Sequence, residues 1–155
     1  MGSIEPGRFR IGLRVDDVVG ASRFYTGLGF EEVGSVPDDQ GPVMVMLARD
    51  GILLMADALV GMPFPDSERE RQTQAGPRGL GVAIGLGVDD LEACYRYCTA
   101  SGCSITQLPH DAPFGDRVFE MIDPYGYQWE ISQPIVDLGD HDPFAATGEA
   151  WFPKG

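Results

Sequence analysis

Two segments of the chain, residues 11–29 and 84–102, repeat one pattern of apolar and polar positions. Each begins Ile-Gly-Leu-x-Val, so that apolar side chains alternate with small or polar ones, as in a strand with one buried face. An Asp-Asp pair follows, and apolar residues then recur with the i, i+3, i+4, i+7 spacing of a helix that buries one side. Roughly half of the aligned positions are identical at a constant offset of 73 residues, which indicates an internal duplication.

The pattern also predicts where each helix begins and ends. Asp16 or Asp17 is placed to cap the first helix, and Asp89 or Asp90 the second, because a carboxylate there accepts from the free N–H groups of the first turn. A glycine after each apolar stripe is expected to end the helix in the left-handed conformation. The stripes with their glycines are Ala21, Phe24, Tyr25, Leu28 and Gly29, and Leu91, Cys94, Tyr95, Cys98 and Gly102.

Three shorter strands are expected after each helix, with tight turns at Arg49-Asp50-Gly51 and Asp123-Pro124-Tyr125-Gly126 between the last two. The expected strands are 30–36, 43–49 and 52–57, then 103–108, 116–122 and 126–132. The predicted fold class is α+β, with two tandem βαβββ modules forming a curved mixed sheet around a shared concave pocket. One domain is expected over residues 1–155: module one at about 8–57, a linker at 58–79, module two at about 80–133 and a tail at 134–155.

Composition limits the classes of partner. The chain has 155 residues and a formal net charge of −13, so nucleic acid, which binds clustered Lys and Arg, is not expected as a partner. No apolar run is long enough to cross a membrane, and the first residues lack the apolar core of a signal peptide, so a cytoplasmic protein is expected. Three cysteines are an odd number for a disulfide framework, and we expect small core residues at Cys94 and Cys98.

The alternation in the last strand predicts which side chains face away from the helix. Tyr127, Trp129 and Ile131 are expected to pack on the helix, which turns Glu130 toward the opposite, concave face. Residues 43–47 and 52–55 are apolar on both faces, so their concave side is expected to be covered by the other module or by a ligand.

A small-molecule site is therefore predicted on the concave side, where apolar walls and small residues meet a few polar groups. The alternative is that the small residues only allow close packing of strands or subunits. Residues 108–117 are expected to form a loop, either a lid that places Phe114 on the ligand or a plain surface loop. The predicted ligand-binding residues are Arg10, Arg14, Val45, Leu53, Met55, Ala83, Gly85, Phe114, Val118, Glu120, Gln128 and Glu130.

The repeated strand–Asp-Asp–helix, the pair Gly29-Phe30 and the ending DPYGYQWEI at 123–131 resemble the vicinal oxygen chelate superfamily of glyoxalases, bleomycin-resistance proteins and dioxygenases. The resemblance extends over about residues 8–133 and is greatest to the metal-free, glyoxalase-like antibiotic-resistance branch. It implies a divalent metal bound at four equivalent strand positions, which here are Arg10, Met55, Ala83 and Glu130. Only Glu130 offers a suitable ligand, so neither a metal nor another cofactor is expected.

The resemblance implies a small-molecule binding protein that sequesters a drug-like or aromatic compound without metal, as a homodimer. The alternative is a metal-dependent lyase, isomerase or dioxygenase of the same superfamily, or an enzyme in which Glu130 or Glu120 acts as a general acid–base. The charge of the ligand stays open. Arg14 lies where glyoxalase I places an arginine for a substrate carboxylate, whereas Glu120 and Glu130 favour a cation. Glu130 alternatively only pairs with Arg10 or Arg14.

Overall fold

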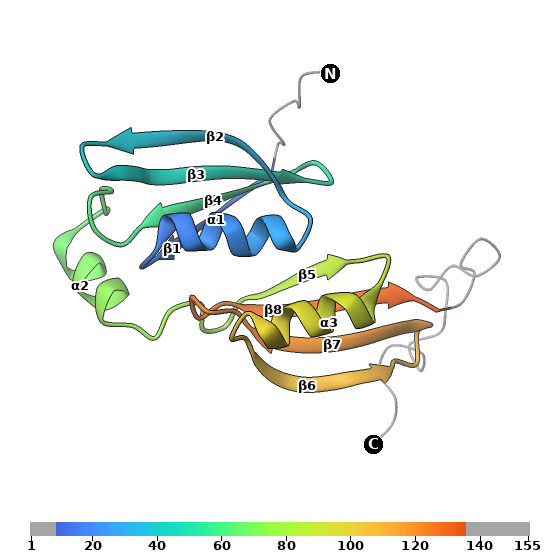
Figure 1. Ribbon diagram of the computed structural model, residues 1–155. Coiled ribbons are helices and arrows are strands. Elements are labelled where there is room, and N and C mark those ends of the chain that lie inside the picture. Colours follow the sequence, from blue (N-terminus) through green and yellow to red (C-terminus); the bar gives the residue numbers. More distant parts are fainter. Residues whose placement is uncertain (1–8, 136–155) are drawn as a thin grey trace. The chain divides into compact units, whose positions relative to one another are not determined.

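The computed structural model describes residues 9–135 and forms two compact units that divide between Arg78 and Gly79. Each unit has its own four-stranded mixed sheet with a helix against one face (Figure 1). The predicted α+β fold of two βαβββ modules is confirmed.

The first unit comprises β1 (Phe9–Val15), α1 (Val18–Gly27), β2 (Glu31–Asp38), β3 (Gly41–Arg49), β4 (Ile52–Ala58) and α2 (Ser67–Ala75), with sheet order β1-β4-β3-β2. The second comprises β5 (Ala83–Gly87), α3 (Leu91–Ala100), β6 (Ser104–Asp111), β7 (Asp116–Ile122) and β8 (Gln128–Pro134), with order β5-β8-β7-β6.

The duplication inferred from sequence is present in the structure. An offset of 73 residues places α1 on α3 and β2 on β6, residue for residue. The match ends before the third strand of each unit: Glu31 lies opposite Ala48 and Ser104 lies opposite Ile122, so β7 is displaced by one residue more than the offset gives. The last turn differs further, because Arg49 pairs with Ile52 across a two-residue turn, whereas Ile122 pairs with Gln128 across five residues. The later strand β8 therefore begins three residues beyond the position that the offset gives.

Both helices start and stop at the predicted residues. Asp17 caps α1 by accepting from the Gly20 N–H at 2.9 Å, and Asp90 caps α3 by accepting from the Ala93 N–H at 3.0 Å. The second aspartate of each pair is thus the cap. Gly29 and Gly102 follow the helices with φ of 96° and 85°, a conformation that glycine adopts at little cost.

One face of the first sheet packs on α1. The strand registers align Leu13, Ala56 and Val45 on this face, and all three are buried. The helix contributes its predicted stripe of Ala21, Phe24, Tyr25 and Leu28, which is buried throughout. Burial of each large apolar side chain contributes about 1.5–3 kcal/mol, so this interface stabilises the unit.

The second unit repeats this arrangement with larger side chains. Trp129 and Ile131 of β8 are fully buried on the side of α3, as the alternation predicts. The rings of Tyr95 and Phe119 meet edge to face at 5.4 Å between centroids. From the predicted α3 stripe, Leu91 and Cys98 are buried, whereas Cys94 and Tyr95 are half-buried.

Asp123 organises the turn between β7 and β8. Its side chain is the one buried charged group in residues 9–135. One carboxylate oxygen accepts from the backbone N–H groups of Tyr125 and Tyr127, at 2.8 and 3.0 Å, and the other accepts from Trp129 Nε1 at 2.9 Å. The motif Asp-Pro-Tyr-Gly therefore links a tight turn to the indole ring in the core.

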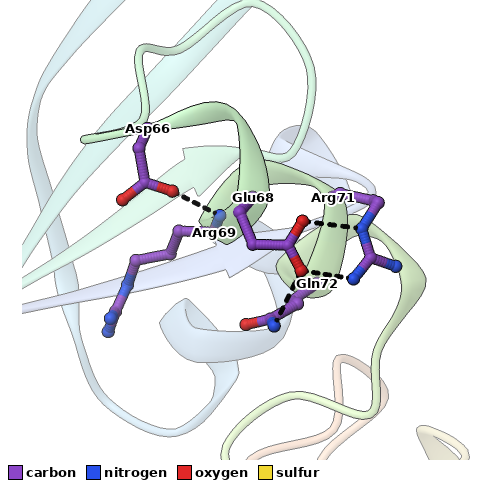
Figure 2. Close-up of polar contacts among 5 residues, drawn as sticks. All are labelled: Asp66, Glu68, Arg69, Arg71 and Gln72. Atoms are coloured by element: carbon purple, nitrogen blue, oxygen red, sulfur yellow. Dashed lines mark hydrogen bonds and ion pairs between the residues drawn. The ribbon is translucent and has the colours of Figure 1, made fainter.

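The predicted linker contains a helix, α2, which sequence reasoning missed. Asp66 caps it by accepting from the Arg69 N–H at 2.7 Å, and Glu68 accepts from Arg71 Nε at 3.0 Å and from Gln72 Nε2 at 3.1 Å (Figure 2). No α2 residue is buried, so local side-chain pairs support the helix in place of a packed face. None of the three helices in residues 9–135 has the length and apolar character that a bilayer crossing requires.

Candidate ligand-binding site

The strand registers make the two sheets comparable on the faces that point away from α1 and α3. Gly12 pairs with Met55 in the first sheet, and its repeat partner Gly85 pairs with Glu130 in the second. Met55 and Glu130 thus occupy equivalent positions, as the family resemblance implied. The face opposite α1 carries Arg10, Gly12, Arg14, Met44, Met46, Leu53, Met55 and Asp57. The face opposite α3 carries Ala83, Gly85, Gly87, Val118, Glu120, Ile122, Gln128, Glu130 and Ser132.

Two carboxylates meet on the face opposite α3. Glu120 and Glu130 are direct partners in the β7–β8 register, and within residues 9–135 neither side chain has a hydrogen-bond or ion-pair partner. Like charges at opposed positions of an antiparallel pair repel each other. Beside them, a Cβ added at Gly85 or at Gly87 would have no other atom within 4 Å. The face therefore combines free volume with uncompensated negative charge.

Val45 is not on the predicted face. It pairs with Ala56 of β4, so its side chain points toward α1 and is buried there, whereas Leu53 and Met55 point the other way. The prediction was wrong because β3 and β4 are apolar on both faces, and alternation then carries no information about direction. Val118, in contrast, does share the face of Glu120 and Glu130.

The predicted loop 108–117 is much shorter in the structure. Strand β6 continues to Asp111, and residues 112–115 form a hairpin turn closed by the Ala112 N–H bonding to Asp116 O at 2.7 Å. Phe114 lies in this turn and is half-buried. So short a turn leaves little chain for a lid, which favours a fixed position for the Phe114 ring.

Arg14 holds the segment that follows β4. Its guanidinium donates to the carbonyl oxygens of Ala58 at 2.9 Å, Met62 at 3.2 Å and Pro63, and it lies 3.8 Å from the centre of the Phe64 ring. These contacts fasten residues 58–64, which we call the strap, to strand β1. Most of the donor capacity of Arg14 is therefore used within the protein.

Asp57 is a candidate site residue that sequence reasoning missed. It pairs with Arg14 across β1 and β4 and points away from α1, and its Oδ1 is buried without a hydrogen-bond partner in residues 9–135. Burial raises the pKa of this carboxyl, and the positive charge of Arg14 opposes the rise. A carboxylate within the apolar run Leu-Leu-Met-Ala-Asp-Ala is the one sequence feature that marks the position.

The residues present do not fit the divalent metal of related enzymes. Met55 and Glu130 are the equivalent positions on β4 and β8, and Arg10 and Ala83 lie two residues before Gly12 and Gly85. A guanidinium and a methyl group donate no electron pair, and a thioether is a poor ligand for a hard cation. In the described residues, no three His, Cys, Asp or Glu side chains gather as a ligand set.

A separate hollow of about 260 Å³ lies in the first unit, between the start of α1 and the β2–β3 turn. Asp17 and Asp38 line it, but both carboxylates already accept hydrogen bonds from backbone N–H groups nearby. None of the predicted ligand-binding residues lines this hollow.

Comparison with known proteins identifies the family to which the chain belongs. The model of the Glyoxalase/Bleomycin resistance protein/Dioxygenase superfamily matches residues 8–131. The chain belongs to this superfamily. The match includes both βαβββ modules, so the resemblance seen in the sequence is confirmed.

Proteins with similar sequences include the uncharacterized protein Mb0911c of Mycobacterium bovis. It is 28% identical over 128 residues, which are 81% of this chain and 82% of that protein. Among solved structures, TioX from Micromonospora sp. ML1 aligns with a TM-score of 0.60 and 22% identity over 81% of this chain and 97% of its own. TnmS3, an antibiotic binding protein from Streptomyces sp. CB03234, aligns with a TM-score of 0.56 and 22% identity over 86% and 99%. At this identity the two structures establish the fold.

Proposed function

We propose that this superfamily member binds a small drug-like or aromatic compound without a metal ion and does not transform it. The observation that carries the proposal is the face opposite α3, where space above Gly85 and Gly87 adjoins Glu120 and Glu130. A ligand site of this kind needs room, apolar contact and a few polar groups. The description of TnmS3 as an antibiotic binding protein supports the same class of function.

The residues proposed to contact the ligand are not equally well supported. Glu120, Glu130 and Gln128 lie on the proposed face, and Ala83 and Val118 supply apolar surface beside them. Arg14 is better explained as the residue that fastens the strap, because its guanidinium already bonds three carbonyl groups. Arg10, Leu53, Met55 and Phe114 stay in the proposal as further contacts, and the sharing of one pocket by the two modules stays a prediction.

The proposal is tested by filling the space. A Gly85→Val side chain enters open volume and suits a strand, so the variant is expected to fold and to lose ligand binding. Thermal-shift screening of bleomycin-type antibiotics and aromatic natural products would find a ligand, since saturation at 100 times Kd stabilises by about 2.7 kcal/mol. Isothermal titration then compares wild type, Gly85→Val and the control Ser35→Val, which adds the same side chain at an exposed residue of β2. Equal affinity of all three proteins would rule out the proposed face.

Metal analysis separates this proposal from the enzymatic alternative. Purified protein is expected to contain far less than one zinc, nickel, iron or manganese ion per chain, because the donor set does not suit one. Stoichiometric metal that is lost on Glu130→Ala substitution would instead support a metal-dependent lyase, isomerase or dioxygenase. A homodimer is proposed from the family resemblance, and light scattering after size exclusion measures it directly.

A further inference from the structure

We propose that Cys98 and Cys103 form a reversible disulfide, which makes the end of α3 a site of oxidative modification that is independent of the proposed ligand binding. All three cysteines of the chain lie in the second unit, and each is a reduced thiol in the structure. Cys98 is fully buried in α3, whereas Cys103 directly precedes β6 and is half-buried. One thiol is therefore within reach of an oxidant in the solvent, and the other is shielded from it.

The backbone at the end of α3 holds this pair together. The Cys103 N–H bonds to Cys98 O at 3.1 Å, the Gly102 N–H bonds to Thr99 O at 3.4 Å, and Gly102 has a φ of 85°. These features define the Schellman motif, in which the first and last of six residues bring their side chains into contact. Cys98 and Cys103 are those two residues, and their thiols are in hydrogen-bond contact. A disulfide here therefore closes a loop that the backbone has already closed.

The first unit contains the same motif without thiols. The Phe30 N–H bonds to Tyr25 O at 3.1 Å, and the two rings meet edge to face at 6.4 Å between centroids. The offset of 73 residues relates Tyr25 to Cys98 and Phe30 to Cys103. The motif thus requires only that two apolar side chains touch, and packing alone does not explain why the second unit has a thiol at both positions.

The third cysteine, Cys94, is a poorer partner for a bond to Cys98. It lies one turn earlier on α3, and its thiol also contacts that of Cys98. Residues four apart on a helix have Cβ atoms about 5–6 Å apart. A disulfide needs a Cβ–Cβ separation of about 3.5–4.5 Å, so a Cys94–Cys98 bond would distort the helix. Cys103, which is outside the helix, is free of this restriction.

The surroundings also decide which thiol reacts first. The hydrogen bond with Cys103 is the largest of the causes that raise the pKa of the Cys98 thiol to about 12. Cys98 therefore keeps its proton at neutral pH, and a protonated, buried thiol is a poor nucleophile toward an external oxidant. Cys103 is the thiol that meets the oxidant, and Cys98 is the thiol that resolves the product.

A hydroperoxide is the class of oxidant that the pair suits. The Cys103 sulfur attacks a peroxide oxygen, the O–O bond breaks, and a sulfenic acid and water form when the oxidant is hydrogen peroxide. The Cys98 sulfur then attacks the Cys103 sulfur, the S–O bond breaks, and the hydroxide leaves with the Cys98 proton as a second water. Two thiols are thereby oxidised by two electrons, and one peroxide is reduced to two waters. The disulfide protects Cys103 from irreversible oxidation to a sulfinic acid, and a thiol reductant restores both cysteines.

Peptide mapping of the full chain tests the proposal. Reduced protein is treated with hydrogen peroxide at a concentration that fully oxidises glutathione, the remaining thiols are alkylated, and trypsin then yields peptide 79–96, with Cys94, and peptide 97–117, with the other two cysteines. Peptide 97–117 is expected to carry no alkyl group and to be lighter than its reduced form by two hydrogen atoms, while peptide 79–96 is alkylated. Dithiothreitol before alkylation should restore alkylation of both peptides.

Two variants and a matched control assign the roles. In Cys98→Ala, Cys103 has no resolving thiol, so its conversion to sulfinic acid is expected to increase at least tenfold over wild type at the same peroxide dose. In Cys103→Ser, which changes a half-buried residue, the shielded Cys98 should stay reduced and be alkylated after digestion. Cys94→Ser is the control and should form the internal disulfide as wild type does.

Three results would overturn the inference. One is a wild-type peptide 97–117 that is alkylated at both cysteines after the peroxide treatment. Another is a covalent link between the two peptides, which would place Cys94 in the bond. The third is sulfinic acid at Cys103 in wild type to the same extent as in Cys98→Ala, which would mean that Cys98 does not resolve the sulfenic acid.

Discussion

The two aspartates that directly follow β3 and β7, Asp50 and Asp123, show how differently one residue type is used. Asp123 is buried and accepts hydrogen bonds from two backbone N–H groups and the Trp129 indole, whereas Asp50 is exposed and, within the described residues, forms an ion pair with the adjacent Arg49 at 3.3 Å. The longer turn of the second unit makes the difference, because it brings the carboxylate over Trp129. How much an aspartate after β3 or β7 contributes to stability therefore depends on the turn in which it lies.

Asp123→Asn is expected to destabilise the protein by about 1–3 kcal/mol, because an amide NH₂ must then face either the backbone N–H groups or the indole N–H. Asp50→Asn is the matched control and should change stability by less than about 0.5 kcal/mol. Urea denaturation followed by circular dichroism measures both. Equal effects of the two substitutions would mean that the Asp123 hydrogen bonds contribute no net stability.

Asp57 is expected to make stability depend on pH. Its pKa is raised above 3.8 in the folded protein, so the folded state holds the proton longer than the unfolded state does. Below pH 3.8 the Asp57 carboxyl is protonated in both the folded and the unfolded state, and it does not change the free energy of unfolding. As pH rises through the folded-state pKa, the folded protein has to ionise a group whose charge is disfavoured by burial, so wild type loses stability. Asp57→Asn should therefore melt at a higher temperature than wild type at pH 7, and the gap should close toward pH 3. The exposed Asp39→Asn should show no such trend, and a constant gap from pH 3 to 7 would contradict the assignment.

At the scale of elements, Arg14 of β1 makes three of the hydrogen bonds that fasten the strap. Arg14→Ala removes the hydrogen bonds to Ala58, Met62 and Pro63, so amide hydrogen exchange in residues 59–64 is expected to accelerate at least tenfold. Arg10→Ala, an exposed arginine of the same strand, provides the control. Mass spectrometry of peptides from this segment distinguishes the two, and unchanged exchange in Arg14→Ala would mean that other contacts fasten the strap.

Sequence predicted those elements whose structure is decided by local spacing. The caps at Asp17 and Asp90 and the alternation around Glu130 depend on neighbours a few residues away, and they were predicted correctly. Helix α2 was missed because a helix with no apolar face leaves no periodic pattern. Strand β6 extends through Pro109 into the predicted loop, because β6 is an edge strand and tolerates a residue without an N–H.

The candidate site was less predictable, since it depends on contacts between distant residues. No sequence pattern indicates that Arg14 bonds a segment more than 40 positions away, or that Asp57 Oδ1 is buried without a hydrogen-bond partner in the described residues. The prediction for Val45 was wrong for a related reason, because only its pairing with Ala56 decides which face its side chain points to.

At the scale of the whole molecule, the two halves have kept one packing plan and diverged on the other face. Leu13 and Leu86, which the offset relates, are both buried against a helix. On the opposite faces, the paired Met46 and Met55 of the first sheet correspond to the paired Glu120 and Glu130 of the second. Duplication therefore supplied two scaffolds, of which one now presents apolar surface and the other negative charge.

The burial of Trp129 gives the second half an optical reporter of its own. It is the one tryptophan in residues 9–135, and it is fully enclosed between β8 and the neighbouring core. The other, Trp151, lies outside the described residues, and a Trp151→Phe protein would emit from position 129 alone. A melt that is followed at once by this emission and by far-ultraviolet dichroism would show whether the duplicated halves lose their structure as one cooperative body or in succession.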